Sequence, residues 1–168
     1  MFTHFPLHPE TPEDGMSLET LFAGRNLDLP AMHERMSKLM AQEGLPYSAR
    51  THTYNSRLAQ ELAKWAEEQP GGDAIHNALF RAYFVDNKNI GRMDELVRIA
   101  ESIGLSGPEA REVLASRSFK DAVDADWIRS RQGGVTGVPT FVAGGYGVVG
   151  AQPYEVLEQL VRQVKEEA

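Results

Sequence analysis

A valine–proline step at positions 138 and 139 constrains the fold of this chain more than any other feature of its sequence. It opens an apolar run at 138–142, which is followed by two glycines and by a second β-branched and aromatic run at 146–149. Two such runs joined by a Gly-Gly pair predict a tight β-hairpin. Because proline cannot donate to a sheet ladder, Pro139 is expected at a sheet edge or at a special site.

The peptide bond before Pro139 has two possible forms. Proline admits the cis form at modest energetic cost. In that form the backbone N–H and C=O groups of Val138 would turn outward, where they could pair with an extended peptide or with the cysteinyl unit of glutathione. Periodicity alone favours the alternative, an ordinary trans proline at the start of a strand. The motifs elsewhere in the chain reverse that preference.

The 168 residues include no cysteine. This excludes structural disulfides, thiolate–zinc sites and a cysteine nucleophile within the chain. A net charge of −7, with no offsetting cluster of lysine and arginine, argues against nucleic-acid binding. No apolar run approaches the roughly 20 residues that span a bilayer, and the N-terminus lacks the regions of a signal peptide. We therefore expect one cytoplasmic domain, 1–168, without a membrane segment.

Apolar spacing along the middle of the chain is helical. A strand is expected at 2–7, before a proline-rich turn. The expected helices cover 31–42, start from caps at Asn55, Asp73 and Ser106, and end with one that opens at Pro153. Sheet-forming parts thus lie at both ends of the chain with a helical block between them. This order predicts an α/β fold with a large all-helical insertion rather than two consecutive domains.

Other candidate motifs have simpler explanations. The glycines at 145–150 match the dinucleotide pattern GxGxxG, but they span a hairpin instead of a strand-to-helix turn. His4 and His8 have a metal-ligand spacing only in a helix, which the neighbouring prolines prevent. No serine-nucleophile signature is present. We therefore predict no metal site and no catalytic residue in this chain.

Six segments in register resemble the DsbA-like thioredoxin superfamily. The resemblance is to the branch that contains 2-hydroxychromene-2-carboxylate isomerase and the FrnE-type oxidoreductases. It rests on residues 5–10, 54–59, 79–84, 89–91, 137–142 and 149–153. It implies a thioredoxin-like fold, incomplete at the N-terminus, in which 1–15 and 116–168 form the thioredoxin-like part and 25–115 the helical insertion.

The resemblance also implies roles for four residues. Pro139 would be the cis-proline of the family, and Val138 its substrate-pairing neighbour. Gln152 would lie where glutathione-using relatives hold a γ-glutamyl carboxylate, and Asn55 would face the substrate cleft from the helical insertion. The substrate would be a peptide or a glutathione-like thiol. The implied activities are disulfide exchange on proteins and glutathione-dependent isomerisation; no cofactor is expected, apart from glutathione as a possible co-substrate.

One departure from the family is large. The first strand, the first helix and the Cys-x-x-Cys motif have no counterpart in this sequence, which leaves strand edges unpaired. We expect either a gene start that has been cut short, the favoured explanation, or a partner chain that closes the gap. The leading hypothesis is a DsbA-family oxidoreductase or isomerase that is inactive because this chain has no cysteine. The alternative is a non-catalytic peptide-binding or assembly module that forms a homodimer through its open sheet edge.

Overall fold

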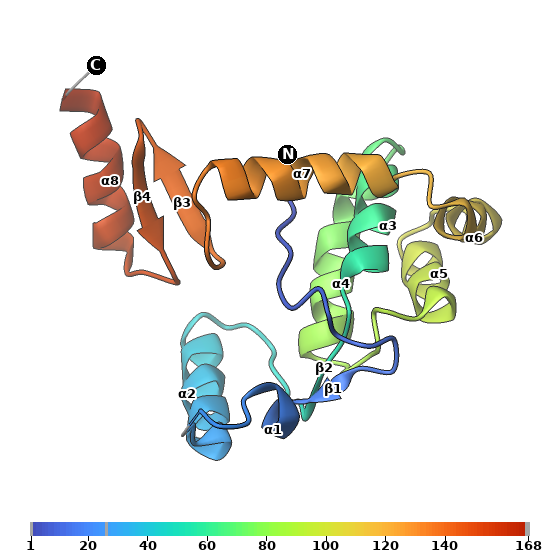
Figure 1. Cartoon of the computed structure of the whole chain (residues 1–168), viewed down its shortest axis with the longest axis horizontal. Helices are drawn as coiled ribbons and strands as arrows, with labels where there is room; N and C mark the ends of the chain where they lie inside the picture. The colour runs from blue at the N-terminus through green and yellow to red at the C-terminus, as the bar shows by residue number, and fades with distance from the viewer. Residues whose placement is uncertain (1, 26, 167–168) are drawn as a thin grey trace. The chain divides into compact units, whose positions relative to one another are not determined.

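The computed structural model describes residues 2–25 and 27–166, which are mostly helical. By its internal contacts the chain divides into two units. One is formed by His8–Val123 and the other by Met1–Leu7 together with Asp124–Ala168. Figure 1 shows the elements of each unit.

Four helices and a short 3-10 turn form the core of the first unit. They are α3 (Arg57–Glu67), η1 (Gly72–Ala74), α4 (Ile75–Phe84), α5 (Met93–Ser102) and α6 (Gly107–Ser116). Each helix places one apolar stripe inward, so Leu62, Ile75, Leu96 and Leu114 are completely buried. Each such side chain contributes about 1.5–3 kcal/mol of burial free energy. This unit therefore has a core of its own, whereas the bounds of the expected helical insertion stay a prediction.

The helix starts follow local sequence signals to different degrees. The Ser106 hydroxyl accepts a hydrogen bond from the backbone N–H of Glu109, which confirms the predicted cap of α6. The predicted cap at Asp73 is wrong, because this residue lies inside η1 and α4 begins after Ala74 without a side-chain cap. Asn55 stands one residue before the N-cap Ser56, yet its side-chain oxygen accepts from the N–H of Arg57.

The first part of this unit carries two shorter helices and a small sheet. These elements are β1 (Met16–Ser17), α1 (Leu18–Leu21), α2 (Leu29–Gln42) and β2 (His52–Thr53), with β1 and β2 antiparallel. The helix predicted at 31–42 is confirmed as α2, and its apolar residues Met32, Met36 and Leu39 are exposed. None of the helices in the described ranges combines the length and apolarity needed to cross a membrane.

The N-terminal segment corrects an expectation from the sequence. Residues 2–7 do not form a strand. The backbone N–H of His4 donates to the carboxylate of Asp126, and its carbonyl accepts from the Ser130 hydroxyl, both on α7 (Lys120–Gln132). Because His4 bonds to side chains of a helix instead of a neighbouring strand, this segment runs without a sheet ladder.

A hairpin and a helix complete the second unit. The predicted strands are confirmed as β3 (Thr140–Ala143) and β4 (Tyr146–Val149), and α8 (Tyr154–Glu166) packs on both (Figure 1). The two-residue turn needs positive φ at Gly144 and Gly145, which have φ of 56° and 84°. The glycines of the GxGxxG pattern thus lie in a turn and a strand.

Candidate functional site

Val138 lies at the entry to β3 with its backbone available. The Val138–Pro139 peptide bond is cis, and the Val138 side chain is 48% exposed. Within the part of the chain that the structure describes, the N–H and C=O of Val138 have no hydrogen-bond partner. The carbonyl of Pro139, in contrast, accepts from the N–H of Gly150 at 2.8 Å. The ladder between the two strands therefore begins after Val138.

Strand register leaves one edge of β3 open. Phe141 faces Val148 and Ala143 faces Tyr146 across the hairpin, alternating with the pairs Thr140↔Val149 and Val142↔Gly147. The two-residue turn makes Ala143 and Tyr146 a hydrogen-bonded pair, and the Gly150–Pro139 bond fixes the same alternation at the other end. The backbone groups of Thr140 and Val142 consequently point away from β4.

The open edge of β3 and the unpaired backbone groups of Val138 lie on the same side of the strand. No strand within residues 2–25 and 27–166 pairs with β3 other than β4. The Val142 side chain is 61% exposed, so the apolar surface beside the edge is also accessible. Such an edge is a template for an added strand, in which main-chain hydrogen bonds give affinity.

Gln152 lies in the loop between β4 and α8. Its side-chain nitrogen donates to the carbonyl of Val149 at 2.9 Å, so one end of the amide folds back on the strand. Its side-chain oxygen has no partner among the described residues, and the residue is exposed. Val138, Pro139 and Gln152 therefore lie in the same unit of the chain. The side-chain oxygen of Gln152 is available there as a hydrogen-bond acceptor.

Asn55 belongs to the helical unit and uses its amide locally. Its nitrogen donates to the carbonyls of Pro9 and Thr11, at 3.1 and 2.8 Å. With the bond from Arg57, these contacts tie residues 9–11 to the start of α3. A role toward substrate stays a prediction for Asn55.

A cavity of about 340 Å³ opens beside Asn55. It is lined by Glu13, Asn55, Arg57, Leu58, Gly91, Met93 and Arg117. Two of these residues hold a buried charge. Glu61 is completely buried, and its carboxylate accepts from Arg57 and from both Nε and Nη2 of Arg117, each at 2.7 Å.

Opposing effects act on the pKa of Glu61. Burial raises it, whereas hydrogen bonds and charges from Arg117 and Arg57 lower it, and the net pKa lies below the ordinary value of 4.5. Glu61 is therefore ionised at neutral pH. The spacing of Arg57 and Glu61 is a recognisable i,i+4 helix pair. Arg117 is 56 residues further on, so sequence reasoning missed this cluster.

These residues supply backbone donors and acceptors but no thiol. The sequence contains no cysteine, so the open edge of β3 can bind a substrate backbone but cannot exchange a disulfide. The edge supplies donors and acceptors at Val138, Thr140 and Val142. These are the groups that an extended peptide requires.

Comparison with known proteins gives one family. The model of the DsbA-like thioredoxin domain matches residues 1–162. The chain is 31% identical over 112 residues to YwbO of Bacillus subtilis, a stretch that covers 66% of this chain and 55% of that protein. The chain therefore matches little more than half of this curated relative.

Solved structures agree with this assignment. The crystal structure described as that of the probable DsbA oxidoreductase SCO1869 from Streptomyces coelicolor is 31% identical, with a TM-score of 0.84, and the match covers 95% of this chain and 72% of that one. The cytosolic disulfide reductase DsbM from Pseudomonas aeruginosa, solved with GSH, is 18% identical, with a TM-score of 0.55 and coverage of 90% and 81%. The thioredoxin-like α/β fold expected from the sequence is thus confirmed.

Proposed function

The chain belongs to the DsbA-like thioredoxin domain family, and on that premise we propose that it is the substrate-holding part of a thiol–disulfide oxidoreductase. In this proposal the open edge of β3 pairs with an extended, cysteine-containing peptide. The single observation that supports it best is the row of backbone groups at Val138, Thr140 and Val142 that point away from β4.

The exchange reaction defines what the chain must receive from elsewhere. A thiolate attacks one sulfur of a disulfide, a new S–S bond forms, the old one breaks, and the second sulfur leaves as a thiolate. Since this chain has no cysteine, the proposal requires the attacking thiolate to come from another group. The role of the β3 edge is to hold the substrate cysteine in an extended backbone while that group reacts.

Glutathione is the small-molecule version of the same substrate. Its cysteinyl unit carries the N–H and C=O needed to pair with Val138, and the exposed Gln152 could approach its γ-glutamyl end. The description of DsbM as a cytosolic reductase solved with GSH supports this proposal by fold alone. We place the activity in the cytoplasm, where glutathione is the major thiol.

A matched pair of prolines tests the edge. Val142 and Gly147 face each other at a non-hydrogen-bonded position, so both N–H groups point outward, one from each edge. Val142→Pro removes a donor from the β3 edge, and Gly147→Pro removes one from the β4 edge, without cutting the ladder between them. Calorimetry with a capped hexapeptide that carries a central S-methylcysteine should show binding to the unmodified chain and to Gly147→Pro. Binding to Val142→Pro should fall at least about tenfold.

Equal loss in the two folded variants, or no binding to the unmodified chain, would reject the proposal. Near-ultraviolet circular dichroism establishes that each variant retains its packing. S-methylglutathione, titrated in parallel, distinguishes a glutathione substrate from a longer peptide. If only the hexapeptide binds, glutathione is not the substrate.

The same open edge favours a second candidate, a non-catalytic module that dimerises by pairing two copies of β3. An accessible strand edge with an exposed apolar residue such as Val142 is a site of self-association. Analytical ultracentrifugation separates the candidates. The oxidoreductase proposal predicts a monomer whose peptide binding is independent of protein concentration, whereas the module predicts a dimer that Val142→Pro dissociates.

A further inference from the structure

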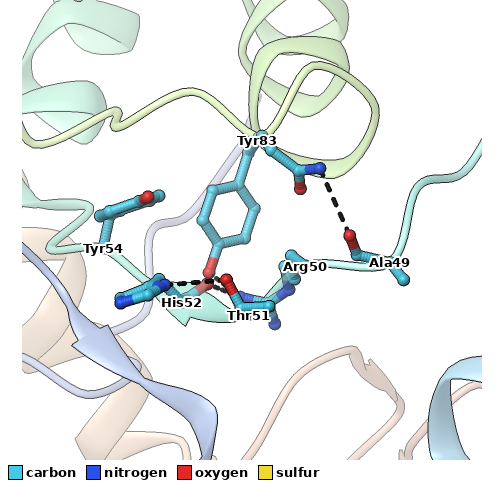
Figure 2. Close-up of a pocket in the computed structure, with 7 residues that line it drawn as sticks. Ala49, Arg50, Thr51, His52, Tyr54 and Tyr83 are labelled. Carbon is cyan, nitrogen blue, oxygen red and sulfur yellow. Dashed lines mark hydrogen bonds between the residues drawn. The ribbon is translucent and has the colours of Figure 1, made fainter. Parts of the chain in front are cut away.

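A second cavity lies in the helical unit, where the segment before β2 meets the end of α4. Its volume is about 210 Å³ (Figure 2). It is lined by Ala49, Arg50, Thr51, His52, Tyr54, Tyr83 and Asn87. Ligand pockets for drug-sized molecules usually measure about 300–1,000 Å³, so any ligand here must be small.

Arg50 is the dominant charge in this cavity. Its guanidinium lies 4.6 Å from the centre of the Tyr83 ring and 5.7 Å from that of Phe84. One nitrogen, Nη1, donates to the carbonyl of His52 at 3.3 Å and also to the Tyr83 hydroxyl. The Tyr83 hydroxyl is in turn 3.1 Å from that of Thr53. The guanidinium is therefore positioned by two aromatic rings and by two hydrogen bonds from Nη1.

No acidic side chain balances this charge. Among residues 2–25 and 27–166, no carboxylate forms an ion pair with Arg50, and its Nε and Nη2 have no hydrogen-bond partner. His52 adds a second polar group, whose free ring nitrogen is a donor in the tautomer in which Nδ1 accepts from the Thr51 hydroxyl. Its Nδ1 is 2.9 Å from the Thr51 hydroxyl and its ring stacks on Tyr54, while its Nε2 has no partner among the same residues.

Arg50 is not required to attach its segment to α4. The N–H of Ser48 already donates to the carbonyl of Phe84 at 3.0 Å, and the side chain of Asn87 donates to the carbonyl of Ala49 at 3.3 Å. These two bonds hold the two residues that precede Arg50 against the end of α4 and the segment after it.

We propose that this cavity binds a small organic carboxylate, with the guanidinium of Arg50 as its principal contact. A planar guanidinium with two free N–H groups matches the two oxygens of a carboxylate. The ring nitrogen of His52 supplies a further contact, and Tyr54 and Tyr83 flank the apolar part of the acid. This site belongs to the helical unit alone and does not depend on the proposal for the β3 edge.

Nuclear magnetic resonance titration of the ¹⁵N-labelled full chain tests the proposal. Sodium propionate is added at constant ionic strength, with propionamide as a neutral probe of the same shape. We expect saturable shifts of the Arg50 Nε–Hε resonance and of the His52 amide with propionate only. Arg50→Gln should weaken the apparent affinity about tenfold or more, and Arg50→Lys, which keeps the charge but loses the fork, should weaken it less.

Arg35→Gln is the matched control, because Arg35 on α2 is an exposed arginine without an acidic partner among the described residues. It should leave the titration unchanged. Shifts that stay linear, that propionamide reproduces, or that persist in Arg50→Gln would overturn the proposal. Tighter binding of inorganic phosphate than of propionate would overturn the carboxylate assignment. If Arg50→Gln does not fold, the comparison of Arg50→Lys with Arg35→Gln decides by the same criteria.

Discussion

Glu61 is the residue on which the stability of the helical unit depends most specifically. Its carboxylate is completely buried and is shared by Arg57 and Arg117. Without these arginines, the desolvation of the ionised carboxylate would be uncompensated. The two guanidiniums therefore determine both the charge state of Glu61 and the anchoring of α3 to the end of α6.

Replacing Glu61 by glutamine should be strongly destabilising. The change removes the buried negative charge that Arg57 and Arg117 share and replaces one acceptor oxygen by an NH₂ donor that faces them, and removing one member of a buried pair costs about 3 kcal/mol or more. Urea unfolding at pH 7 measures the free energy of unfolding. The control is Glu34→Gln, which removes the exposed Glu34–Lys38 pair and should change stability by less than about 1 kcal/mol. Equal effects of the two changes would contradict this account of Glu61.

The same carboxylate predicts a pH dependence. The pKa of Glu61 is lower in the folded chain than its ordinary value of 4.5, so its ionisation contributes stability above that pH. This contribution is lost as pH falls below 4.5 through the folded pKa. Unfolding free energies measured between pH 6 and the acid range should therefore decrease less steeply for Glu61→Gln than for the unmodified chain. Parallel curves would be evidence against it.

Among the elements, the β3–β4 hairpin depends on the two glycines of its turn. Gly144 and Gly145 both have positive φ, but only Gly144 has a neighbour behind it. A Cβ added at Gly144 would lie 2.7 Å from Cγ2 of Val164 on α8, whereas one at Gly145 would meet no atom within 4 Å. The turn thus sets how closely α8 can approach the strands.

This contrast gives a matched pair of substitutions. Alanine at either glycine should lower the free energy of unfolding by roughly 1–2 kcal/mol, because a residue with a Cβ is strained in the left-handed conformation. Gly144→Ala should lose at least about 1 kcal/mol more than Gly145→Ala, because it also overlaps Val164. Stability is followed through the amide resonances of β3 and β4 during urea unfolding. A second change, Val164→Ala, should recover the difference in the Gly144→Ala background. If it does not, the contact with Val164 is not the cause.

Helices and strands could be predicted where a short stretch of sequence determines them. The hairpin follows from two apolar runs around a Gly-Gly pair, and α6 follows from the capping residues Ser106 and Glu109. Residues 2–7 were expected as the end of a strand that runs into a proline-rich turn. Strand formation also needs a neighbouring backbone, and here His4 bonds to side chains of α7.

The candidate site was predictable only in part. The substrate-binding roles of Val138, Pro139 and Gln152 come from the family resemblance and stay predictions. The bond from Asn55 to Thr11 and the bonds from Arg117 to Glu61 join residues that are 44 and 56 positions apart. Such pairs leave no periodic signal in one sequence, and neither does the stacking of Arg50 on Tyr83.

At the scale of the whole molecule, the absence of thiols makes a direct prediction. The purified chain should not accelerate insulin reduction by dithiothreitol beyond the uncatalysed rate, since it cannot form a mixed disulfide. The turbidity of precipitating insulin chains measures the rate, with a cysteine-containing family member as the positive control. Clear turnover by this chain would show that a route other than cysteine exchange operates.

Residue-resolved amide hydrogen exchange tests the central claim, that the edge of β3 pairs with an extended substrate. Saturation with the S-methylcysteine hexapeptide should slow exchange at Val138, Thr140 and Val142. The outward amides of Gly147 and Val149 on β4 should exchange at unchanged rates, and those of Phe141 and Ala143 are already protected within the hairpin. Protection of the β4 edge instead, or unchanged exchange along β3 with peptide bound, would contradict the account.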